Sequence, residues 1–373
     1  MWKFFAADAV VVISLACSGC DGERTCQDRF TCDADAGMDA KQVTTDAPSD
    51  TGDATNDVAE DVARDVALLD AGADSETMID GRLLDVSDDS ARGPTVDFEW
   101  ANWPMPNPPS TGLPHPQNYD YTSQPGVVKD LVTGLVWQRT VEGGDAGAEF
   151  TWNAAQGYCA TLALTGSDDW RLPTRIELIS IVDQTRPSPG PVIDLSAFPN
   201  APGAVFWSAS PSAGDSSKAW TVDFGPGFAA PATSTNTCRV RCVRAGASVS
   251  GDAGPRYSVA GDGTAYDSKT MLRWKQNLEP MSYTWTAAQG RCQQLAGGSW
   301  RVPSMKELMT IVDVRQKTPP VIDAVAFPGT APDFFWTSSQ FASNSSLTWT
   351  VTFLDGSANI DGAANMYAVR CVQ

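Results

Sequence analysis

The chain contains one ordered set of motifs twice, and this internal duplication limits the folds open to it. The segment WRLPTRIELISIVD begins at Trp170, and WRVPSMKELMTIVD begins at Trp300. Other motifs match in the same order on both sides: TWNAAQGYC and TWTAAQGRC, PVIDLSAFP and PVIDAVAFP, VFWSAS and FFWTSS, and VRCV at Cys242 and at Cys371. The period of about 130 residues exceeds the roughly 20 to 50 of a solenoid repeat, so each copy is expected to be a domain with its own core.

The length of 373 residues agrees with two such domains behind a separate N-terminal part. From the motifs we expect copy one at residues 96–246 and copy two at residues 256–373. Each copy has the pattern of an opening strand, two helices and several short strands rich in aromatic and β-branched residues. The predicted fold class is α+β, with two helices per copy packed on antiparallel strands.

Most of the negative charge lies outside the two copies. The net charge is −19, and the stretch from 33 to 91 holds 17 acidic residues, three basic residues and no aromatic residue. Such a stretch buries too little apolar surface to fold, so residues 21–95 are predicted to be a disordered acidic linker. The copies are close to charge balance, and neither a nucleic-acid partner nor a cofactor is expected.

Residues 1–20 have the layout of a bacterial secretory signal peptide. Lys3 precedes an apolar run that is too short to span a bilayer, and small residues precede Cys17 and Cys20. Cys20 is the preferred lipidation site and Cys17 is the alternative. The competing interpretation is an ordinary cleaved signal without lipidation. Both interpretations predict export; lipidation further predicts a protein anchored in the bacterial cell envelope, at the outer membrane or the cell surface.

Nine cysteines in an exported chain are expected to form disulfides. Each copy has one cysteine in its first predicted helix and one in its last predicted strand. The economical pairing joins the two within each copy: Cys159 with Cys242, and Cys292 with Cys371. Cys26 and Cys32 can form a small loop ahead of the linker. Cys238 has no counterpart in copy two, and the sequence leaves open whether it is free, competes with Cys242 or pairs with another chain.

The recurring glutamates have a structural explanation. Thr174 lies three residues before Glu177, and Ser304 lies three residues before Glu307, each ahead of an apolar run. This spacing is that of the capping box, in which the two side chains satisfy amides at the start of a helix. Because glutamine also serves in a capping box, Glu177→Gln is expected to be nearly silent.

The sequence argues against most classes of enzyme. The single histidine, His115, lies in a proline-rich lead-in outside both duplicated cores, which excludes Ser-His-Asp or Cys-His catalysis in both copies and multi-histidine zinc sites. Neither a glycine-rich phosphate loop nor a G-x-S-x-G elbow is present. Carboxylate-dependent glycan processing remains an alternative through Asp183, Asp194 and Asp223, although Thr352 replaces Asp223 in copy two.

One segment of copy two invites comparison with calcium loops. DGSANIDGAAN, from Asp355 to Asn365, alternates small oxygen-bearing residues, but it lacks the sixth-position glycine and the closing glutamate of an EF-hand. The corresponding segment of copy one, GPGFAAPATSTN, contains no acidic residue. A hairpin loop is therefore expected, and no metal site is predicted.

The motifs together carry a family resemblance. TGLVWQ, TWNAAQGYC, DWRLPTRIEL, AFP, FWSAS, AWTVDF and VRCV, in this order, resemble the C-terminal domain family of the Legionella collagen-like adhesin. WRLP and RCV are also similar to the C-type-lectin-like and formylglycine-generating folds, which implies two tandem C-type-lectin-like domains. The family resemblance implies an exported, non-catalytic binding module, because the adhesin's domain recognises sulfated surface polysaccharides.

We therefore expect a surface lipoprotein whose copies bind polysaccharide or another extracellular ligand, such as a protein, weakly per copy and more tightly as a tandem. A structural envelope protein without a glycan ligand is the alternative, and a glycan-processing enzyme is the second. Ligand-binding residues stay unassigned, because the basic candidates are scattered: Arg171, Arg175, Arg239, Arg241 and Arg244 in copy one, and Arg301, Lys306 and Arg370 in copy two. Arg171 and Arg301 are expected to make ion pairs or backbone contacts, and Trp100 and Trp103 to cover the surface of copy one.

Overall fold

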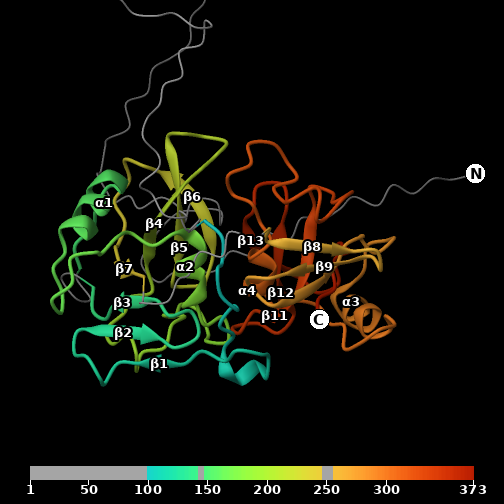
Figure 1. Cartoon of the computed structure of the whole chain (residues 1–373), viewed down its shortest axis with the longest axis horizontal. Coiled ribbons are helices and arrows are strands. Elements are labelled where there is room, and N and C mark those ends of the chain that lie inside the picture. The colour runs from blue at the N-terminus through green and yellow to red at the C-terminus, as the bar shows by residue number, and fades with distance from the viewer. Residues whose placement is uncertain (1–98, 142–146, 246–254) are drawn as a thin grey trace, which may run out of the picture. The chain divides into compact units, whose positions relative to one another are not determined.

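The computed structural model describes residues 99–141, 147–245 and 255–373. The predicted signal peptide, its Cys17 and Cys20, the loop of Cys26 and Cys32, and the acidic linker all lie outside the described residues. Residues 99–125, which we call the lead-in segment, are the part of copy one that precedes its first duplicated motif and include its first strand. Figure 1 shows copy one, coloured green to yellow, beside copy two, coloured orange to red.

Copy one contains two antiparallel sheets and two helices. The first sheet has the strand order β1-β2-β3-β7, and the second has the order β4-β5-β6. The elements are β1 Tyr119–Asp120, β2 Val127–Asp130, β3 Val136–Gln138, α1 Trp152–Thr161, α2 Arg175–Ser180, β4 Val205–Pro211, β5 Lys218–Asp223, β6 Ala229–Thr233 and β7 Val243–Arg244. A short 3-10 helix, Pro109–Thr111, lies in the lead-in segment.

Copy two repeats this order of elements. Its sheets have the orders β10-β9-β8 and β11-β12-β13, and its last strand is reduced to an isolated bridge between Trp274 and Val372. The elements are β8 Tyr257–Ala260, β9 Thr264–Asp267, β10 Leu272–Lys275, α3 Trp285–Gln293, α4 Met305–Met309, β11 Phe334–Gln340, β12 Leu347–Thr352 and β13 Ala358–Gly362. All the paired strands run antiparallel, so the predicted α+β class is confirmed.

The helices differ in how they are buried. On α1 only Ala155 and Cys159 are buried, one turn apart, so this helix contacts the core along a narrow stripe. In contrast, α2 buries all six of its residues, including Arg175 and Glu177. No helix among the described residues is long and apolar enough to cross a membrane.

Disulfides join the first helix of each copy to its C-terminal end. The bonds are Cys159–Cys242 and Cys292–Cys371, which confirms the predicted pairing. Each closes a loop of about 80 residues, for which chain-entropy arguments give roughly 4 kcal/mol of stabilisation. Cys238 is buried and is also disulfide-bonded, so it is not a free thiol. Its partner is not among the other four described cysteines, because they pair with one another.

The largest hydrophobic cluster contains residues of both copies. Two smaller clusters surround the disulfides, one in each copy. The main cluster, however, joins Trp220, Val222 and Phe224 of copy one to Trp349, Val351 and Phe353 of copy two. The expectation of one separate core per copy therefore describes only the smaller clusters, since both copies share the principal core.

In the shared core, a hairpin turn of each copy packs against the other copy. A Cβ atom added to Gly227, in the β5–β6 turn of copy one, would lie 3.5 Å from the ring of Trp349 in copy two. Conversely, one added to Gly356, in the β12–β13 turn, would lie 3.8 Å from the ring of Trp220 and 2.6 Å from Val312 Cγ1. Both glycines have a positive φ, so the turns need glycine for their backbone conformation as well as for the close approach.

Two buried basic side chains cross the same interface. Lys306 of α4 is fully buried, and its Nζ donates to the carbonyl oxygens of Ser180 at 2.7 Å and Val182 at 2.9 Å, at the C-terminal end of α2. A cation is favoured there because the carbonyl groups at a helix C-terminus carry partial negative charge. Arg175 of α2 makes the opposite crossing, donating to the carbonyl oxygen of Gly356 at 3.3 Å.

The lead-in segment packs against both copies. Trp103 and Met105 belong to the shared core. The ring of Trp100 faces two cations of copy two, with centroid distances of 4.7 Å to Arg256 and 5.3 Å to Arg315. Trp100 and Trp103 are expected from the sequence to cover the surface of copy one; instead Trp103 lies in the shared core and Trp100 contacts copy two.

The buried lysine makes stability depend on pH. Burial lowers the pKa of Lys306 to about 7, although Asp130 and Asp183 act in the opposite direction. Between that pH and the ordinary lysine pKa of 10.5, only the unfolded state holds the proton, so the contribution of Lys306 to stability rises with pH. In chemical denaturation, the unfolding free energy of the wild-type chain should therefore increase relative to that of Lys306→Met as the pH rises above 7. If the difference in unfolding free energy between the two proteins did not change with pH, Lys306 would not be a buried amine with a lowered pKa.

Candidate functional site

An arginine–glutamate pair lies at the start of the second helix in each copy. Arg171 donates to Glu177 at 2.5 and 2.7 Å, and Arg301 donates to Glu307 at 2.6 and 2.8 Å. Both glutamates are buried, whereas the arginine side chains are 28% and 25% exposed. Each arginine thus reaches the surface with its charge already balanced.

The same glutamates also cap the N-terminus of the second helix in each copy. Glu177 accepts from the Thr174 amide at 2.8 Å, and Glu307 accepts from the Ser304 amide at 2.8 Å. Both second helices begin with the predicted capping box, and in copy two Ser304 Oγ accepts from the Glu307 amide at 3.2 Å. The expectation that Glu177→Gln is nearly silent must be revised, because the carboxylate is a buried ion-pair partner as well as a cap.

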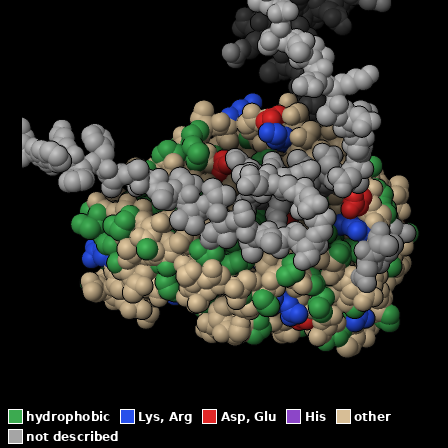
Figure 2. All heavy atoms as spheres, turned by 180° about the vertical axis from the view of Figure 1, so that it is seen from behind, with side chains coloured by type: hydrophobic (Ala, Val, Ile, Leu, Met, Phe, Trp, Pro, Cys, Tyr) green, Lys and Arg blue, Asp and Glu red, His purple; other side chains and the backbone are tan. Residues whose placement is uncertain are grey.

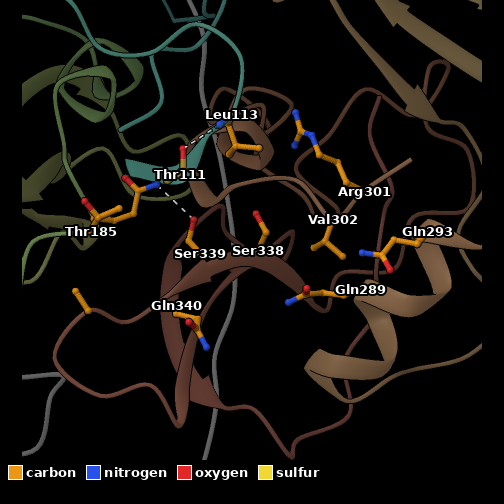
Figure 3. Close-up of a pocket in the computed structure, with 12 residues that line it drawn as sticks. Thr111, Leu113, Thr185, Gln289, Gln293, Arg301, Val302, Ser338, Ser339 and Gln340 are labelled. Atoms are coloured by element: carbon orange, nitrogen blue, oxygen red, sulfur yellow. Dashed lines mark hydrogen bonds between the residues drawn. The ribbon is translucent and has the colours of Figure 1, made fainter. Parts of the chain in front are cut away.

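A cavity of about 420 Å³ opens where the lead-in segment, copy one and copy two meet. Thr111 and Leu113 come from the lead-in segment, and Gln184 and Thr185 follow α2 of copy one. Copy two supplies the remaining wall: Gln289 and Gln293 from α3, Arg301, Val302, the β11 residues Ser338, Ser339 and Gln340, and Ala342. Figure 3 shows α3 on one side of the cavity and Thr185 on the opposite side, with β11 between them.

The polar side chains of the cavity divide into those that are hydrogen-bonded within the protein, such as Ser339, and those that are not. Ser339 Oγ accepts from the Met305 amide at 3.0 Å and from Gln184 Nε2 at 3.3 Å. Within the part of the chain that the structure describes, the side chains of Gln289, Gln293 and Ser338 make no hydrogen bond. These groups can therefore donate to a ligand and accept from it.

Sequence reasoning did not identify this site. The motifs shared by the two copies do not point to it, because several lining residues occupy positions where the copies differ. Gln293 occupies the position of Ala160, and Ser338 occupies that of Ala209. The signal that could have revealed the site is that copy two has polar residues at positions where copy one has apolar residues, although the sequence around them matches.

A second, more charged cavity of about 360 Å³ lies on the first sheet of copy one. Its charged lining residues are Asp120, Lys129 and Arg244. Arg244 also pairs with Asp169 at 3.7 Å, and Asp120 accepts from the amides of the turn that follows it. In copy two Tyr266 replaces Lys129 and Gln373 replaces Arg244, so this cationic character is confined to copy one.

Most of the basic residues considered as anion ligands have structural roles. Arg241 and Arg370 are buried and donate to main-chain carbonyl groups, and burial lowers the pKa of each to about 9. Arg239 pairs with Glu149 at 3.5 Å. Arg175 and Lys306 lie in the interface between the copies. These basic residues are thus scattered over the structure, and several of them are buried and cannot contact a ligand at the surface.

The carboxylates considered for catalysis serve separate turns. Asp183 accepts from Thr185, Asp194 accepts from the Ser196 amide, and Asp223 accepts from the Gly225 amide. The calcium-like segment of copy two forms the β12–β13 hairpin, in which Asp361 accepts from Thr350 and Tyr367. Across residues 99–141, 147–245 and 255–373, no three His, Cys, Asp or Glu side chains cluster as a metal site requires.

Comparison with protein families agrees with the duplication. Two segments, residues 126–244 and 263–373, match the Lcl C-terminal domain. The matches correspond to the two copies, begin after the lead-in segment and confirm the resemblance seen in the sequence. A search of curated proteins finds no match.

The buried ion pair gives a stability prediction. Glu307→Gln keeps a side chain that can cap α4 but leaves Arg301 without its counter-charge. Breaking a buried pair in this way should lower the unfolding free energy by about 3 kcal/mol. Asp215→Asn, which removes an exposed pair with Lys218, is the control and should have little effect. Equal effects in the two variants, measured by urea denaturation, would show that the Arg301–Glu307 pair contributes no more than a surface pair.

Proposed function

Because the chain belongs to the Lcl C-terminal domain family, we propose that it is an exported bacterial surface protein whose tandem copies bind an extracellular polysaccharide without turning it over. The family is a bacterial surface adhesin domain, which supports a location in the cell envelope. Anchoring through a lipid on Cys20, or alternatively Cys17, would hold the copies at the surface on the acidic linker. The bond from the first helix to the C-terminal end supports a C-type-lectin-like arrangement in each copy.

The observation that carries this proposal is the cavity shared by the lead-in segment and both copies. Ligand pockets are concave and place a few polar groups precisely, and a cavity of about 420 Å³ falls in the common range of roughly 300 to 1,000 Å³. Its amide and hydroxyl groups suit a polyhydroxylated ligand. Because both copies supply its walls, we propose the tandem as the binding unit, with one composite site in place of a weak site in each copy.

A binding role also suits the chemistry around the cavity. The lining includes no Asp, Glu, His or Cys among the described residues, so it offers no general acid, general base or thiol nucleophile. The only histidine, His115, is exposed in the lead-in segment. These features favour recognition over the alternative of a glycan-processing enzyme.

A glycan array tests the function. The secreted full-length chain should bind at least one polysaccharide, should keep that binding in the presence of a metal chelator, and should release no free sugar. Release of sugar would contradict the non-catalytic role. Failure of the folded chain to bind any glycan would favour a structural role in the envelope.

A further inference from the structure

We infer that the composite cavity accepts an uncharged sugar unit and that the side chains specific to copy two select it. This inference rests on the proposed function and narrows it to a ligand class. It is carried by three observations: how the two copies differ, which polar groups are unengaged, and how the local charge is balanced.

The two copies differ at the cavity in a consistent direction. Gln293, Ser338 and Gln340 line the cavity in copy two. The corresponding positions in copy one are Ala160, Ala209 and Pro211, none of which has a polar side chain. Strands β4 and β11 contain the same irregularity in register at this point, so the backbones correspond and the difference lies in the side chains. Copy two therefore carries hydrogen-bonding groups on one wall of the cavity that copy one lacks.

These groups provide both donors and acceptors. Each glutamine amide offers two N–H donors and a carbonyl acceptor, and Ser338 offers a hydroxyl. In the described ranges, none of the side chains of Gln289, Gln293, Gln340 and Ser338 has a hydrogen-bond partner in the protein. Sugar hydroxyl groups also donate and accept, so a sugar can satisfy such a wall, whereas a carboxylate or sulfate only accepts.

The charges near the cavity balance without a ligand. Arg301 is the only charged side chain in the described lining, and both of its terminal nitrogens donate to Glu307. A negatively charged ligand would have to compete with that buried carboxylate. On the face shown in Figure 2, the Lys and Arg side chains among the described residues are isolated rather than gathered into a basic surface.

Copy one shows how an anion is accommodated on the same scaffold. Ser210, the counterpart of Ser339, accepts from the Arg175 amide at 2.9 Å and donates to Glu99 of the lead-in segment at 2.6 Å. The positive charges of Arg175 and Arg171 act on that carboxylate. In copy two Met305 replaces Arg175, so the equivalent position lacks the second cation. Ser339 has no carboxylate partner among the described residues.

The experiment compares neutral and anionic glycans with the secreted full-length chain. Immobilised glucans, mannans and chitooligosaccharides are the neutral probes, and heparin and alginate are the anionic probes. The strongest neutral ligand is then titrated calorimetrically at low and high salt. We expect binding to a neutral probe that changes little with salt, because screening acts on charges.

Variants test the location. Gln293→Ala combined with Ser338→Ala installs the residues that copy one already has, so the fold should tolerate the change. Loss of about two hydrogen bonds should weaken neutral-glycan binding about tenfold. Gln156→Ala changes the exposed copy-one counterpart of Gln289, which does not line the cavity, and should leave binding unchanged.

The outcomes separate the two proposals. Salt-sensitive binding of anionic probes alone, lost in Lys129→Ala, would overturn the neutral-sugar inference and leave the polysaccharide-binding function intact, with its site in the cationic cavity of copy one. Neutral binding unaffected by the double variant would overturn the assignment to this cavity. Failure of the folded chain to bind any probe in either set would overturn both.

Discussion

The rest of the structure depends on the reciprocal burial of hairpin tips between the two copies. Each copy inserts a glycine-containing turn against the central tryptophan of the other, Gly227 against Trp349 and Gly356 beside Trp220. Lys306 and Arg175 cross the same boundary to reach main-chain carbonyl groups. Buried cations are tolerated only where polar groups receive them, so these contacts fix how the copies pack. The two copies therefore form one unit with a shared core.

This packing also creates the candidate site. The cavity needs the loop after α2 of copy one, the lead-in segment, and α3 and β11 of copy two, and it exists because the interface holds these parts together. Once two copies are fixed in one unit, equivalent surfaces no longer have equivalent surroundings. Copy one has Glu99 bonded to Ser210, whereas the corresponding surface of copy two lines a cavity and bears additional amides and a hydroxyl. Divergence between the copies is thus where function is best sought.

Local signals allowed much of the fold to be predicted from sequence. The disulfide pairs followed from matched positions, and the second helices from Thr174–Glu177 and Ser304–Glu307, because capping depends on residues a few positions apart. The shared core did not follow, because Gly227 and Gly356 look like ordinary loop residues until the opposite copy is in place. Lys306 looks like a surface cation for the same reason: its helix is covered on every side by tertiary contacts. The site was missed because its residues come from three segments and several differ between the copies.

Differential scanning calorimetry of the region from the lead-in segment to the C-terminus tests most directly whether the two copies form one unit. A shared core predicts a single transition whose calorimetric enthalpy equals its van't Hoff enthalpy. Gly356→Ala, which places a methyl group against Val312, should move that whole transition to lower temperature without splitting it. Two separate transitions, with only the copy-two transition shifted by Gly356→Ala, would contradict the account.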